Sequence, residues 1–476
     1  MTVLTAAESR EADRLTIEEN GVPSLALMEN AAHRVDETLV AEFDPLTAKY
    51  VVILCGKGNN GGDGLALARL LIGKVSRLYV VLACDPAELK GDAKVNYDRL
   101  VSDGVVPQRD IPSKLRERLQ VDVVVDALLG TGVKGPPQGR ILELIRATRE
   151  FPSAKIVSID LPSGLGGGGE CVRAGITVTF TAPKVEHYLA EGAEGNVGRL
   201  VVSQIGCPPQ YAVSQLALSD PRDFSPLFAP RKKDAHKGDY GHVLVIGGAP
   251  GKSGAAAMAG LAALRMGAGL VSVTSHAAIQ IAPELMTETL EDFSLERKTV
   301  LAIGPGLGLN RELVHGVLSK ANVPTVIDAD ALNSIAGSDF HGRGVETILT
   351  PHPGEMARLL GRPVGDRVKD ARGFAQERNV CLVLKGHRTL VAMPDGQVYI
   401  NLSGSPAMAK GGSGDILTGM TAGLVAQFPD RIGAAMRAAV WMHGRCGELA
   451  AEEWTDQCVL ATDLLRYLPR AIHEIV

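Results

Sequence analysis

Short β-branched runs alternate with helix-length segments along most of the chain, and this alternation is the strongest constraint on its fold. It is typical of α/β proteins built on mostly parallel sheets. In the first half the sequence predicts five strands, over residues 50–55, 77–83, 121–126, 155–160 and 199–205. In the second half it predicts strands over 241–246, 270–274, 300–303, 325–328, 348–350 and 380–385, two short strands around the turn 394–396, and closing helices over 414–426, 432–451 and 462–471.

Five prolines interrupt the alternation between residues 207 and 233: Pro208, Pro209, Pro221, Pro226 and Pro230. Because proline fixes φ and donates no backbone hydrogen bond, this density ends strands and helices alike. The sequence therefore predicts two domains, over residues 1–215 and 236–476, joined by a proline-rich linker over 216–235. A length of 476 residues is compatible with that division.

Charge and cysteine usage argue against several classes of protein. The chain carries 49 Lys and Arg against 54 Asp and Glu, a formal net charge of −5, which does not favour a nucleic-acid-binding surface. Seven cysteines without a C-x-x-C pair argue against a disulfide framework or a structural zinc site. The charged N-terminus does not resemble a signal peptide, and Arg265 interrupts the apolar stretch 254–273. We expect a cytoplasmic protein without membrane or nucleic-acid partners.

Glycine is over-represented, with 54 residues, and many of them fall in turns after predicted strands. In the first such turn, Gly56, Gly58 and Gly61 satisfy the G-x-G-x-x-G spacing of dinucleotide-binding turns. The acidic residue expected about 20 positions later is missing, since the nearest is the more distant Asp85, and Asp63 stands where a pyrophosphate would lie. Ordinary dinucleotide binding and a plain tight turn both stay open, and the later run 166–169 is predicted to be a glycine loop.

Two further strands of the first half end in aspartate, at Asp126 and Asp160. Ligands of open α/β sheets bind beyond the carboxyl ends of strands, so both side chains are expected near the first glycine turn. Either aspartate alone is compatible with capping a helix. Oxygen atoms of Asn60, Asp126 and Ser163 suit a hard cation, which leaves Asp160 for acid–base chemistry.

The strongest signal of the second half is the sequence AKGGSGD, which ends at Asp415 and enters a predicted helix. Three glycines allow backbone N–H groups to surround a phosphoryl group, and Asp415 is placed to accept a hydroxyl proton. A simple helix-capping aspartate is the alternative. The sequence GGAPGKS at 247–253 lacks one glycine of a P-loop but still predicts an anion-binding turn. His352 in TPHPGE, and Lys385 and His387 in LKGHRT, are equally compatible with ligand contact and with structural roles.

The first-half motifs GNNGGDG, VVDALLGTG, IDLPSG and TFTAPKVEH resemble the YjeF N-terminal family of NAD(P)HX epimerases over residues 1–215. The resemblance implies a Rossmann-like, three-layer α/β/α fold and interconversion of the R and S epimers of reduced nicotinamide nucleotides hydrated at C6. It implies a potassium ion at Asn60, Asp126 and Ser163, and Asp160 at the reacting group. The implied substrate-binding residues are Asn59, Asn60, Gly61, Gly62, Asp63, Gly130, Thr131, Gly132, Val133, Lys134, Gly135, Pro136 and Asp160.

The second-half motifs GPGLG, TPHPGE, LKGHRT and AKGGSGD resemble the YjeF C-terminal family of ribokinase-like dehydratases over residues 230–476. The resemblance implies that Ala255, Gly306, His352 and Asp415 contact the hydrated nucleotide, with Asp415 as general base. The phosphodonor, ADP rather than ATP, and Mg²⁺ are implied as well. The implied nucleotide-binding residues are Lys385, Gly386, His387, Arg388, Thr389 and Gly414.

Both halves together resemble the family of bifunctional NAD(P)H-hydrate repair enzymes, with NADHX and NADPHX as substrates and self-association into a homo-oligomer expected. Two other functions stay open on the residues. A ribokinase-like small-molecule hydroxyl kinase would release a stable phosphorylated product, whereas a dehydratase would release inorganic phosphate and reduced nicotinamide. A binding protein would use its N-terminal half only to sense a nucleotide.

Overall fold

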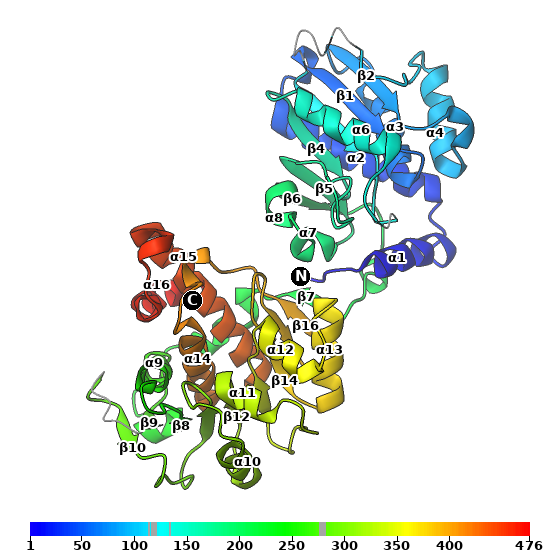
Figure 1. Ribbon diagram of the computed structural model, residues 1–476. Coiled ribbons are helices and arrows are strands. Elements are labelled where there is room, and N and C mark those ends of the chain that lie inside the picture. Colours follow the sequence, from blue (N-terminus) through cyan, green and yellow to red (C-terminus); the bar gives the residue numbers. More distant parts are fainter. Residues whose placement is uncertain (113–114, 116–120, 133–134, 276–281) are drawn as a thin grey trace. The chain divides into compact units, whose positions relative to one another are not determined.

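Two sheets organise the chain, one in each of the two units into which its contacts divide it (Figure 1). The computed structural model describes residues 1–112, 115, 121–132, 135–275 and 282–476. One unit comprises Thr2–Ser214, and the other comprises Gln215–Val476 together with Met1. The predicted α/β class with two domains is confirmed. The structure places the segment predicted as a linker in the second unit, because Leu216–Leu218 is a strand of its sheet.

The sheet of the first unit is entirely parallel and has the strand order β2-β1-β3-β4-β5-β6. Its strands are β1 (Tyr50–Cys55), β2 (Arg77–Leu82), β3 (Val123–Ala127), β4 (Lys155–Ile159), β5 (Ile176–Phe180) and β6 (Arg199–Ser203). Strand β5 was not among the five strands that the sequence predicts. The order reverses at β1, which lies between β2 and β3, and such switch points are where α/β sheets bind ligands.

Helices cover both faces of this first sheet. Alternate residues of β1 point in opposite directions: Val51 and Ile53 pack in one core with residues of α2, α3 and α4, whereas Val52 and Leu54 pack in a second core with residues of α6. These two cores make the unit a three-layer α/β/α structure. Its helices are α1 (Ala6–Glu18), α2 (Ser24–Phe43), α3 (Asn59–Leu71), α4 (Gly91–Ser102), α6 (Gly139–Ala147), α7 (Glu186–Leu189) and α8 (Ala193–Asn196).

The sheet of the second unit has the order β10-β9-β8-β11-β12-β13-β14-β15-β16-β7. Its strands are β7 (Leu216–Leu218), β8 (His242–Ile246), β9 (Leu270–Thr274), β10 (Met286–Glu288), β11 (Val300–Ile303), β12 (Thr325–Ile327), β13 (Thr347–Leu349), β14 (Cys381–Leu384), β15 (Leu390–Ala392) and β16 (Val398–Ile400). The pairings β14–β15 and β15–β16 are antiparallel, and the latter forms the hairpin predicted around residues 394–396. Strands β7 and β10 are additional to the prediction.

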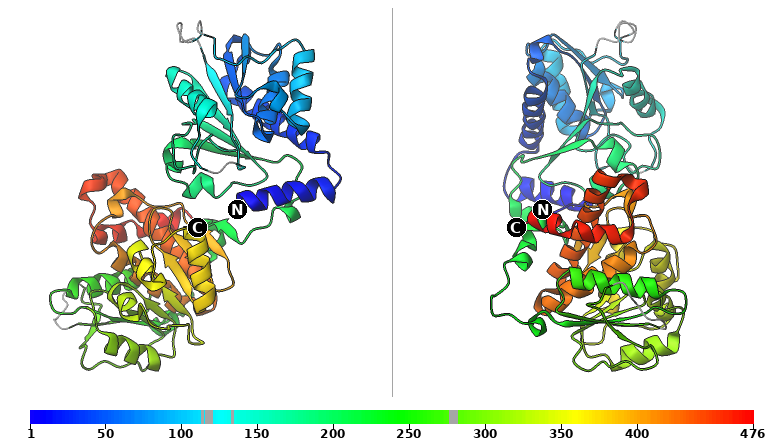
Figure 2. Two further views of the ribbon diagram at one scale, coloured as in Figure 1. Left: turned by 45° about the vertical axis from the view of Figure 1, so that its right-hand side comes forward. Right: turned by 90° about the vertical axis from the view of Figure 1, so that its left-hand side faces the viewer.

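The helices of the second unit form layers against its sheet (Figure 2). They are α9 (Ser253–Arg265), α10 (Arg311–Lys320), α11 (Ala329–Ile335), α12 (Pro353–Leu360), α13 (Arg367–Arg378), α14 (Ser413–Gln427), α15 (Ile432–Cys458) and α16 (Leu468–His473). Helix α14 is almost entirely buried, since it packs against α9, α15 and the sheet at once. Among the described helices, none is long and apolar enough to cross a membrane.

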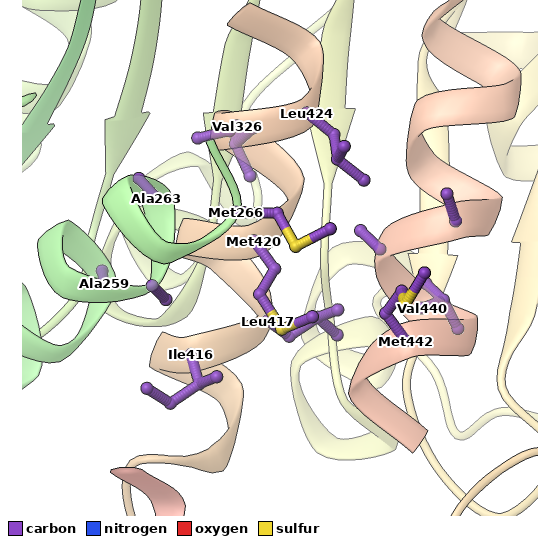
Figure 3. Close-up of a cluster of buried hydrophobic side chains, with 14 of the residues drawn as sticks. Ala259, Ala263, Met266, Val326, Ile416, Leu417, Met420, Leu424, Val440 and Met442 are labelled. Atoms are coloured by element: carbon purple, nitrogen blue, oxygen red, sulfur yellow. The ribbon is translucent and has the colours of Figure 1, made fainter. Parts of the chain in front are cut away.

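Small residues allow α9 and α14 to approach each other closely. A Cβ atom on Gly419 would lie 2.0 Å from the backbone oxygen of Ala259, and one on Gly423 would lie 2.6 Å from that of Ala263. Figure 3 shows Ala259, Ala263 and Met266 beside Met420 and other apolar side chains of α14. This contact fixes the position of α14, whose first turn carries Asp415.

Candidate active sites

A cavity of about 630 Å³ opens in the first unit beyond the carboxyl ends of β1, β3, β4 and β5. Helices α1 and α2 close it on another side. The predicted site residues among its lining are Asn59, Asn60, Asp63, Gly130, Thr131, Gly132 and Asp160. Lining residues that sequence reasoning did not assign include Asp13 and Lys184.

Close backbone contacts explain the glycines of the turn after β1. A Cβ atom on Gly56 would lie 1.9 Å from the oxygen of Leu128, and one on Gly61 would lie 1.9 Å from the oxygen of Gly56 itself. A side chain on Gly56 would push the turns after β1 and β3 apart, and one on Gly61 would displace the turn after β1 itself. The glycines thus bring the start of α3, with Asn59, Asn60 and Asp63, to the cavity.

Asp160 forms the central ion pair of the cavity with Lys184. The Lys184 Nζ atom lies 2.8 Å from Asp160 Oδ1, and the Lys184 side chain is only 2% exposed. The Thr179 hydroxyl donates a hydrogen bond of 3.0 Å to the same carboxylate oxygen. Burial by itself opposes ionisation of Asp160, but the Lys184 charge and these hydrogen bonds outweigh it and lower the pKa of Asp160. Asp160 is therefore a stable carboxylate, held in a left-handed backbone conformation with φ 64°.

His187 forms hydrogen bonds with the backbone of both residues of this ion pair. Its Nδ1 accepts a hydrogen bond of 2.9 Å from the Lys184 backbone N–H, so Nε2 carries the ring proton and donates to the Asp160 carbonyl oxygen at 2.8 Å. Burial lowers the pKa of His187 to about 4, and the ring stays neutral at physiological pH. His187 thus fixes the backbone on both sides of the ion pair.

Two further carboxylates line the same cavity, Asp13 from α1 and Asp63 from α3. Burial and the negative charge of Asp160 raise the pKa of Asp63 well above its ordinary value. Burial likewise raises the pKa of Asp13 to about 6, although the Lys184 ammonium opposes the shift. The cavity therefore holds carboxyl groups in different protonation states near neutral pH.

Asp126 and Ser163 lie behind the cavity and form a buried hydrogen-bonded group. Asp126 accepts hydrogen bonds from Ser163 Oγ at 2.5 Å, from Ser163 N at 2.8 Å and from Ser158 Oγ at 2.8 Å. The Ser163 hydroxyl also accepts from Leu129 N, and Asn60 Nδ2 donates to the carbonyl oxygen of the same leucine. Asn60 Oδ1 is buried and has no hydrogen-bond partner among the described residues. The structure thus brings the three predicted potassium ligands together around one turn.

The remaining predicted residues of the first site support its backbone. Gly61 and Gly62 make close contacts within the unit and are not part of the cavity lining. Gly135 and Pro136 pack against the glycine run, since Cβ atoms on Gly167 and Gly169 would lie 2.6 Å and 2.9 Å from them. The predicted glycine loop is thus a series of turns that a side chain would displace. Val133 and Lys134 lie outside the described residues.

In the second unit, Asp415 occupies the first turn of α14, directly after the glycine turn. The N-cap is Gly412, in a left-handed conformation with φ 96°, so Asp415 is not the capping residue. Burial raises the pKa of Asp415 to about 6, with a further contribution from Asp328 and an opposing one from Lys385. A carboxyl group with this pKa accepts a proton readily near neutral pH.

Lys385 lies against the glycine turn and is held by acidic partners. Its Nζ donates a hydrogen bond of 2.7 Å to Asp328 Oδ1, and it would lie 3.4 Å from a Cβ atom on Gly414. Thr418 of α14 donates to the other oxygen of Asp328 at 2.7 Å. Burial opposes the charge on Lys385, but Asp328 and Glu355 outweigh it and raise the pKa of Lys385. The positive charge of Lys385 therefore faces the glycine turn before Asp415.

His352 caps helix α12 and is linked to this lysine. Its Nδ1 accepts hydrogen bonds from the backbone N–H groups of Gly354 and Glu355, at 3.0 Å and 3.3 Å. Glu355 lies 3.9 Å from Lys385 Nζ through one oxygen and 3.4 Å from His352 Nε2 through the other. His352 thus has a structural role, and its side chain remains about half exposed.

Ala255 and Gly306 meet at the other glycine turns of the unit. A Cβ atom on Gly306 would lie 3.0 Å from that of Ala255 and 2.6 Å from the oxygen of Lys252. Asp330 Oδ2 accepts a hydrogen bond of 2.7 Å from Gly308 N and lies 3.4 Å from Lys252 Nζ. The turns after β8 and β11 therefore meet at the point where the strand order of the second sheet reverses.

The segment from Lys385 to Thr389 is positioned mainly through its backbone. Arg367 donates to the carbonyl oxygens of His387 and Arg388, at 2.7 Å and 3.0 Å. The Thr389 hydroxyl donates to the Gly386 oxygen at 3.0 Å, and Arg388 donates to the oxygen of Leu402. The structure does not direct all of these side chains to one point.

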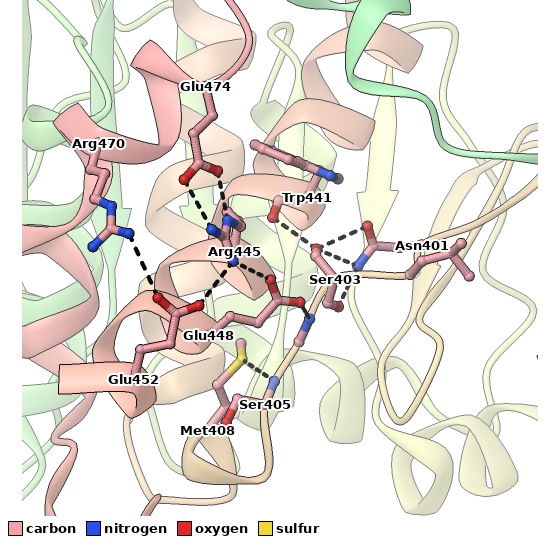
Figure 4. A network of polar contacts seen from close by, with 12 residues as sticks. Asn401, Ser403, Ser405, Met408, Trp441, Arg445, Glu448, Glu452, Arg470 and Glu474 are labelled. Carbon is pink, nitrogen blue, oxygen red and sulfur yellow. Dashed lines mark hydrogen bonds and ion pairs between the residues drawn. The ribbon is translucent and has the colours of Figure 1, made fainter. Parts of the chain in front are cut away.

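A polar network holds the loop that precedes the glycine turn of Asp415 (Figure 4). Ser403 donates to the Trp441 oxygen of α15 at 2.9 Å, and Glu448 accepts from Gly404 N at 2.8 Å. Arg445 donates to Glu448 and also to Glu474 of the C-terminal segment. The loop is therefore anchored on α15 before the chain turns into α14.

Two family models match the chain. The model described as YjeF-related protein N-terminus matches residues 24–186, and the one described as NAD(P)H-hydrate dehydratase matches residues 243–470. Proteins named bifunctional NAD(P)H-hydrate repair enzyme are similar over the full chain. The one from Moorella thermoacetica is 39% identical, with 100% of this chain and 97% of the relative covered. The one from Escherichia coli is 34% identical, with 100% and 95% covered.

Solved structures resemble the second unit. The ADP/ATP-dependent NAD(P)H-hydrate dehydratase from Bacillus subtilis, co-crystallised with ATP and Mg²⁺, has 33% identity and a TM-score of 0.52. The match covers 56% of this chain and 100% of that chain. A ribokinase-like superfamily protein from Enterococcus faecalis has 29% identity and a TM-score of 0.52, with 56% and 98% covered. The ribokinase-like expectation for the second unit is thereby confirmed.

Proposed function

The chain belongs to the family of bifunctional NAD(P)H-hydrate repair enzymes, with an epimerase domain followed by a dehydratase domain, and we propose how its two sites perform the two reactions. The first cavity interconverts the R and S epimers of NAD(P)HX. The site at Asp415 dehydrates the S epimer to NAD(P)H. The observation that carries the second assignment is the position of Asp415, with its raised pKa, beside the glycine turn and Lys385.

Epimerisation at C6 needs a proton donor and a proton acceptor rather than an external reagent. The C6 hydroxyl is next to the ring nitrogen, so water leaves when the hydroxyl is protonated and the nitrogen lone pair forms an iminium. Water then returns to the opposite face and loses a proton. Asp160, kept ionised by Lys184, is the proton acceptor that the site offers, and the cavity walls hold the ring in place.

The residues of the first unit fit a potassium ion. Asn60 Oδ1 is a buried acceptor without a hydrogen-bond partner among the described residues, and Asp126 and Ser163 add oxygen atoms close to the same turn. Hard cations take such oxygen ligands. Bound there, the ion would supply positive charge beside the turns that hold the nucleotide. No group of three or more His, Cys, Asp or Glu residues suited to a metal occurs in the described part of the chain, so a softer transition metal is not favoured.

Dehydration requires a better leaving group than hydroxide at C6. Asp415 accepts the proton of the C6 hydroxyl. The hydroxyl oxygen at the same time attacks the terminal phosphoryl group of ADP or ATP. The backbone N–H groups of the glycine turn and the Lys385 ammonium stabilise the charge on that group. Phosphate then leaves C6 as the ring nitrogen forms an iminium, and loss of the C5 proton to water restores the dihydropyridine double bond. The nucleotide is converted to AMP or ADP, and the hydroxyl oxygen departs with the phosphate.

We propose that Mg²⁺ is held mainly by the phosphates of the nucleotide, with no more than one or two of the carboxylates Asp328, Asp330 and Asp415 as further ligands. The ion would supply neutralising charge to those phosphates. We propose ADP as the preferred donor, and ATP as the less effective one. The proposed nucleotide contacts are the backbone of Lys385–Thr389 and Gly414.

One assay tests the two activities together. The protein is incubated with a mixture of hydrated NADH epimers, with ADP or ATP in turn, and the recovery of reduced-nicotinamide absorbance is followed. Complete recovery is expected with ADP. Absence of recovery with either donor would contradict the dehydratase assignment. A stable phosphorylated nucleotide in place of inorganic phosphate would favour the hydroxyl kinase.

The same assay isolates the first site. The Asp160→Asn variant is expected to recover only the S epimer, apart from spontaneous epimerisation, because the proton acceptor is lost. Complete and equally fast recovery by this variant would contradict the proposed role of Asp160. A preference for NADHX or NADPHX and self-association of the chain both stay predictions. We also propose a cytoplasmic location, in line with seven cysteines that all remain unpaired.

A further inference from the structure

We propose that Asp13 of α1 is the second proton-transfer residue of the epimerase site and that it exchanges a proton with the C6 oxygen of the hydrated nicotinamide. The inference rests on the proposed function, which leaves the partner of Asp160 unassigned. Asp13 lies outside the matched stretch of the N-terminal family model, which begins at residue 24. It nevertheless lines the cavity together with Asp63, Asp160 and Lys184.

The chain before α1 fixes the position of Asp13 relative to the central ion pair. Leu4 forms a parallel bridge with Lys184: its N–H donates to the Pro183 oxygen and its own oxygen accepts from Val185 N, each at 2.9 Å. Leu4 is fully buried. A capping box between Thr5 and Glu8 then starts α1 immediately after this bridge. The turn that carries Lys184 and the helix that carries Asp13 are therefore held as one assembly.

The Asp13 carboxylate is not occupied by structural contacts. In the part of the chain that the structure describes, it accepts no hydrogen bond, whereas Asp160 accepts from Thr179 and from Lys184. The neighbouring arginine on the helix, Arg14, pairs with Glu11 and Glu18 instead. A half-buried carboxyl group that faces a cavity without a protein partner is available to a ligand.

The charges around the cavity assign different protonation states to its carboxyl groups. Asp13, Asp63 and Asp160 face the buried cation Lys184. The other charged side chains of the cavity lining are Arg10, Lys57, Glu88 and Asp92. Three carboxylates so placed do not all ionise together. Burial and the charge of Asp160 raise the pKa of Asp13 to about 6, while Lys184 keeps Asp160 ionised. Asp13 therefore both holds and releases a proton close to neutral pH.

Asp63 is less suited to the same exchange. Burial and the charge of Asp160 raise its pKa well above the ordinary value, which disfavours its ionised form, and it belongs to the turn predicted to hold the nucleotide. Proton transfer is most efficient when the pKa of the group lies near the working pH. This difference favours Asp13 over Asp63 as the group that cycles.

The proposed exchange balances without any further reactant. Protonated Asp13 donates to the C6 hydroxyl, the C6–O bond breaks, and water leaves as the ring nitrogen forms the iminium. Water then adds to the opposite face of C6, and Asp160 takes one of its protons. A proton transfer between the two carboxyl groups through water resets the site. The oxidation state of the ring does not change, and the reverse direction exchanges the two roles.

The test uses the full chain and four variants: Asp13→Asn, Asp13→Glu, Asp63→Asn and, as a matched control, Glu11→Gln. Glu11 lies on the same helix, is exposed and is not part of the cavity lining. Purified R epimer is converted without a phosphodonor, and the epimers are separated by chromatography over a range of pH. Dehydration of purified S epimer by the same samples reports on the second site, and thermal unfolding reports on folding.

For Asp13→Asn we expect a loss of about 10²- to 10³-fold in epimer exchange, with unchanged dehydration of the S epimer. In the wild type, kcat/KM for exchange should fall above about pH 6, because the donor form of Asp13 is lost there. This fall in kcat/KM above about pH 6, the alkaline limb of the pH profile, should be absent in Asp13→Asn. Asp13→Glu should retain the limb and part of the rate, and Glu11→Gln should match the wild type.

Several results would overturn the inference. They are an Asp13→Asn variant within threefold of the wild-type exchange rate, a limb near pH 6 that persists in Asp13→Asn, and a limb that disappears only in Asp63→Asn. Equal loss of exchange in Asp13→Asn and Asp13→Glu with lowered thermal stability would also reject it, as a structural role. Failure of the wild type itself to exchange epimers would instead contradict the proposed function.

Discussion

The ammonium group of Lys184 lies 2.8 Å from the carboxylate of Asp160, and the lysine side chain is 2% exposed. A cation buried to this extent is stable only because partners surround it: Nζ also donates to Thr179 Oγ1 and to the Phe180 oxygen. The pair joins the ends of β4 and β5, since Asp160 follows one strand and Lys184 lies in the turn after the other. The same ion pair therefore contributes to the stability of the first unit and keeps Asp160 ionised.

Replacing Lys184 with methionine should affect both properties. The change leaves Asp160 in a buried position without its counter-charge, which should cost about 3 kcal/mol in the free energy of unfolding. Epimer exchange should fall at least about 100-fold, because Asp160 loses the charge that keeps it ionised. Chemical denaturation and the exchange assay measure the two effects.

The matched control for this change is Lys94→Met. Lys94 pairs with Asp98 on the surface of α4, with 42% of its side chain exposed, and exposed pairs contribute less than about 1 kcal/mol. Equal losses of stability in the two variants would show that the Lys184 pair is no stronger than a surface contact.

Glycine 419 offers a test of how the α9–α14 contact supports the second site. In Gly419→Ala the new methyl group would lie 2.0 Å from the Ala259 oxygen, so the helices must separate. We expect a loss of at least about 2 kcal/mol in the free energy of unfolding and lower dehydration, because α14 carries Asp415. The control is Gly316→Ala. Gly316 lies on the exposed side of α10 with open space around it, so the change should stabilise the protein by up to about 1 kcal/mol. A neutral Gly419→Ala would refute the close packing.

Removal of potassium should impair the first site alone. In buffer with Na⁺ or choline in place of K⁺, epimer exchange should fall severalfold, because Asn60 Oδ1 would lack the cation that compensates for its burial. Asn60→Ala should abolish the dependence on K⁺. Titration of KCl with the exchange assay, and with a thermal-shift assay as a second readout, measures the effect. Exchange that is equally fast in choline would contradict the proposed potassium site.

Local sequence signals predicted the parts of each site that one strand and its following turn supply. The turn of Gly56 and Gly61, the aspartate that follows β4 and the glycine turn before Asp415 are each encoded within about ten residues of sequence. Close backbone contacts require glycine at positions 56 and 61, and a left-handed conformation favours it at position 412. That is why the fold class and most strands followed from the sequence alone.

The missing parts depend on contacts between distant segments. Asp13 and Lys184 are brought together by the bridge from Leu4 to Lys184, which no local pattern announces. Strand β7 lies in a proline-rich segment and is defined by pairing with β16, whose residues follow much later in the chain. For His352, the sequence left ligand contact and a structural role open, and the structure shows that it caps α12.

Asp415 allows catalysis and stability to be separated by pH. Its pKa is about 6 in the folded chain, against an ordinary value of 3.8, so folding favours the protonated form. Ionisation of this group therefore costs stability progressively as pH rises from about 4 to about 6, and the cost is constant above that. The dehydration rate should behave in the opposite way and fall below about pH 6, because the base is then protonated.

The variant Asp415→Asn should consequently lose dehydration by about 10²- to 10⁴-fold and still unfold at a higher temperature than the wild type at pH 7. At pH 4 the difference in unfolding temperature should be much smaller, because the wild-type group is then protonated in the folded chain and only about half ionised in the unfolded chain. A helix-capping role predicts the reverse, a less stable variant at pH 7. Calorimetry at the two pH values, with the dehydration assay at pH 7, distinguishes the two. A less stable variant that keeps its activity would reject Asp415 as the general base.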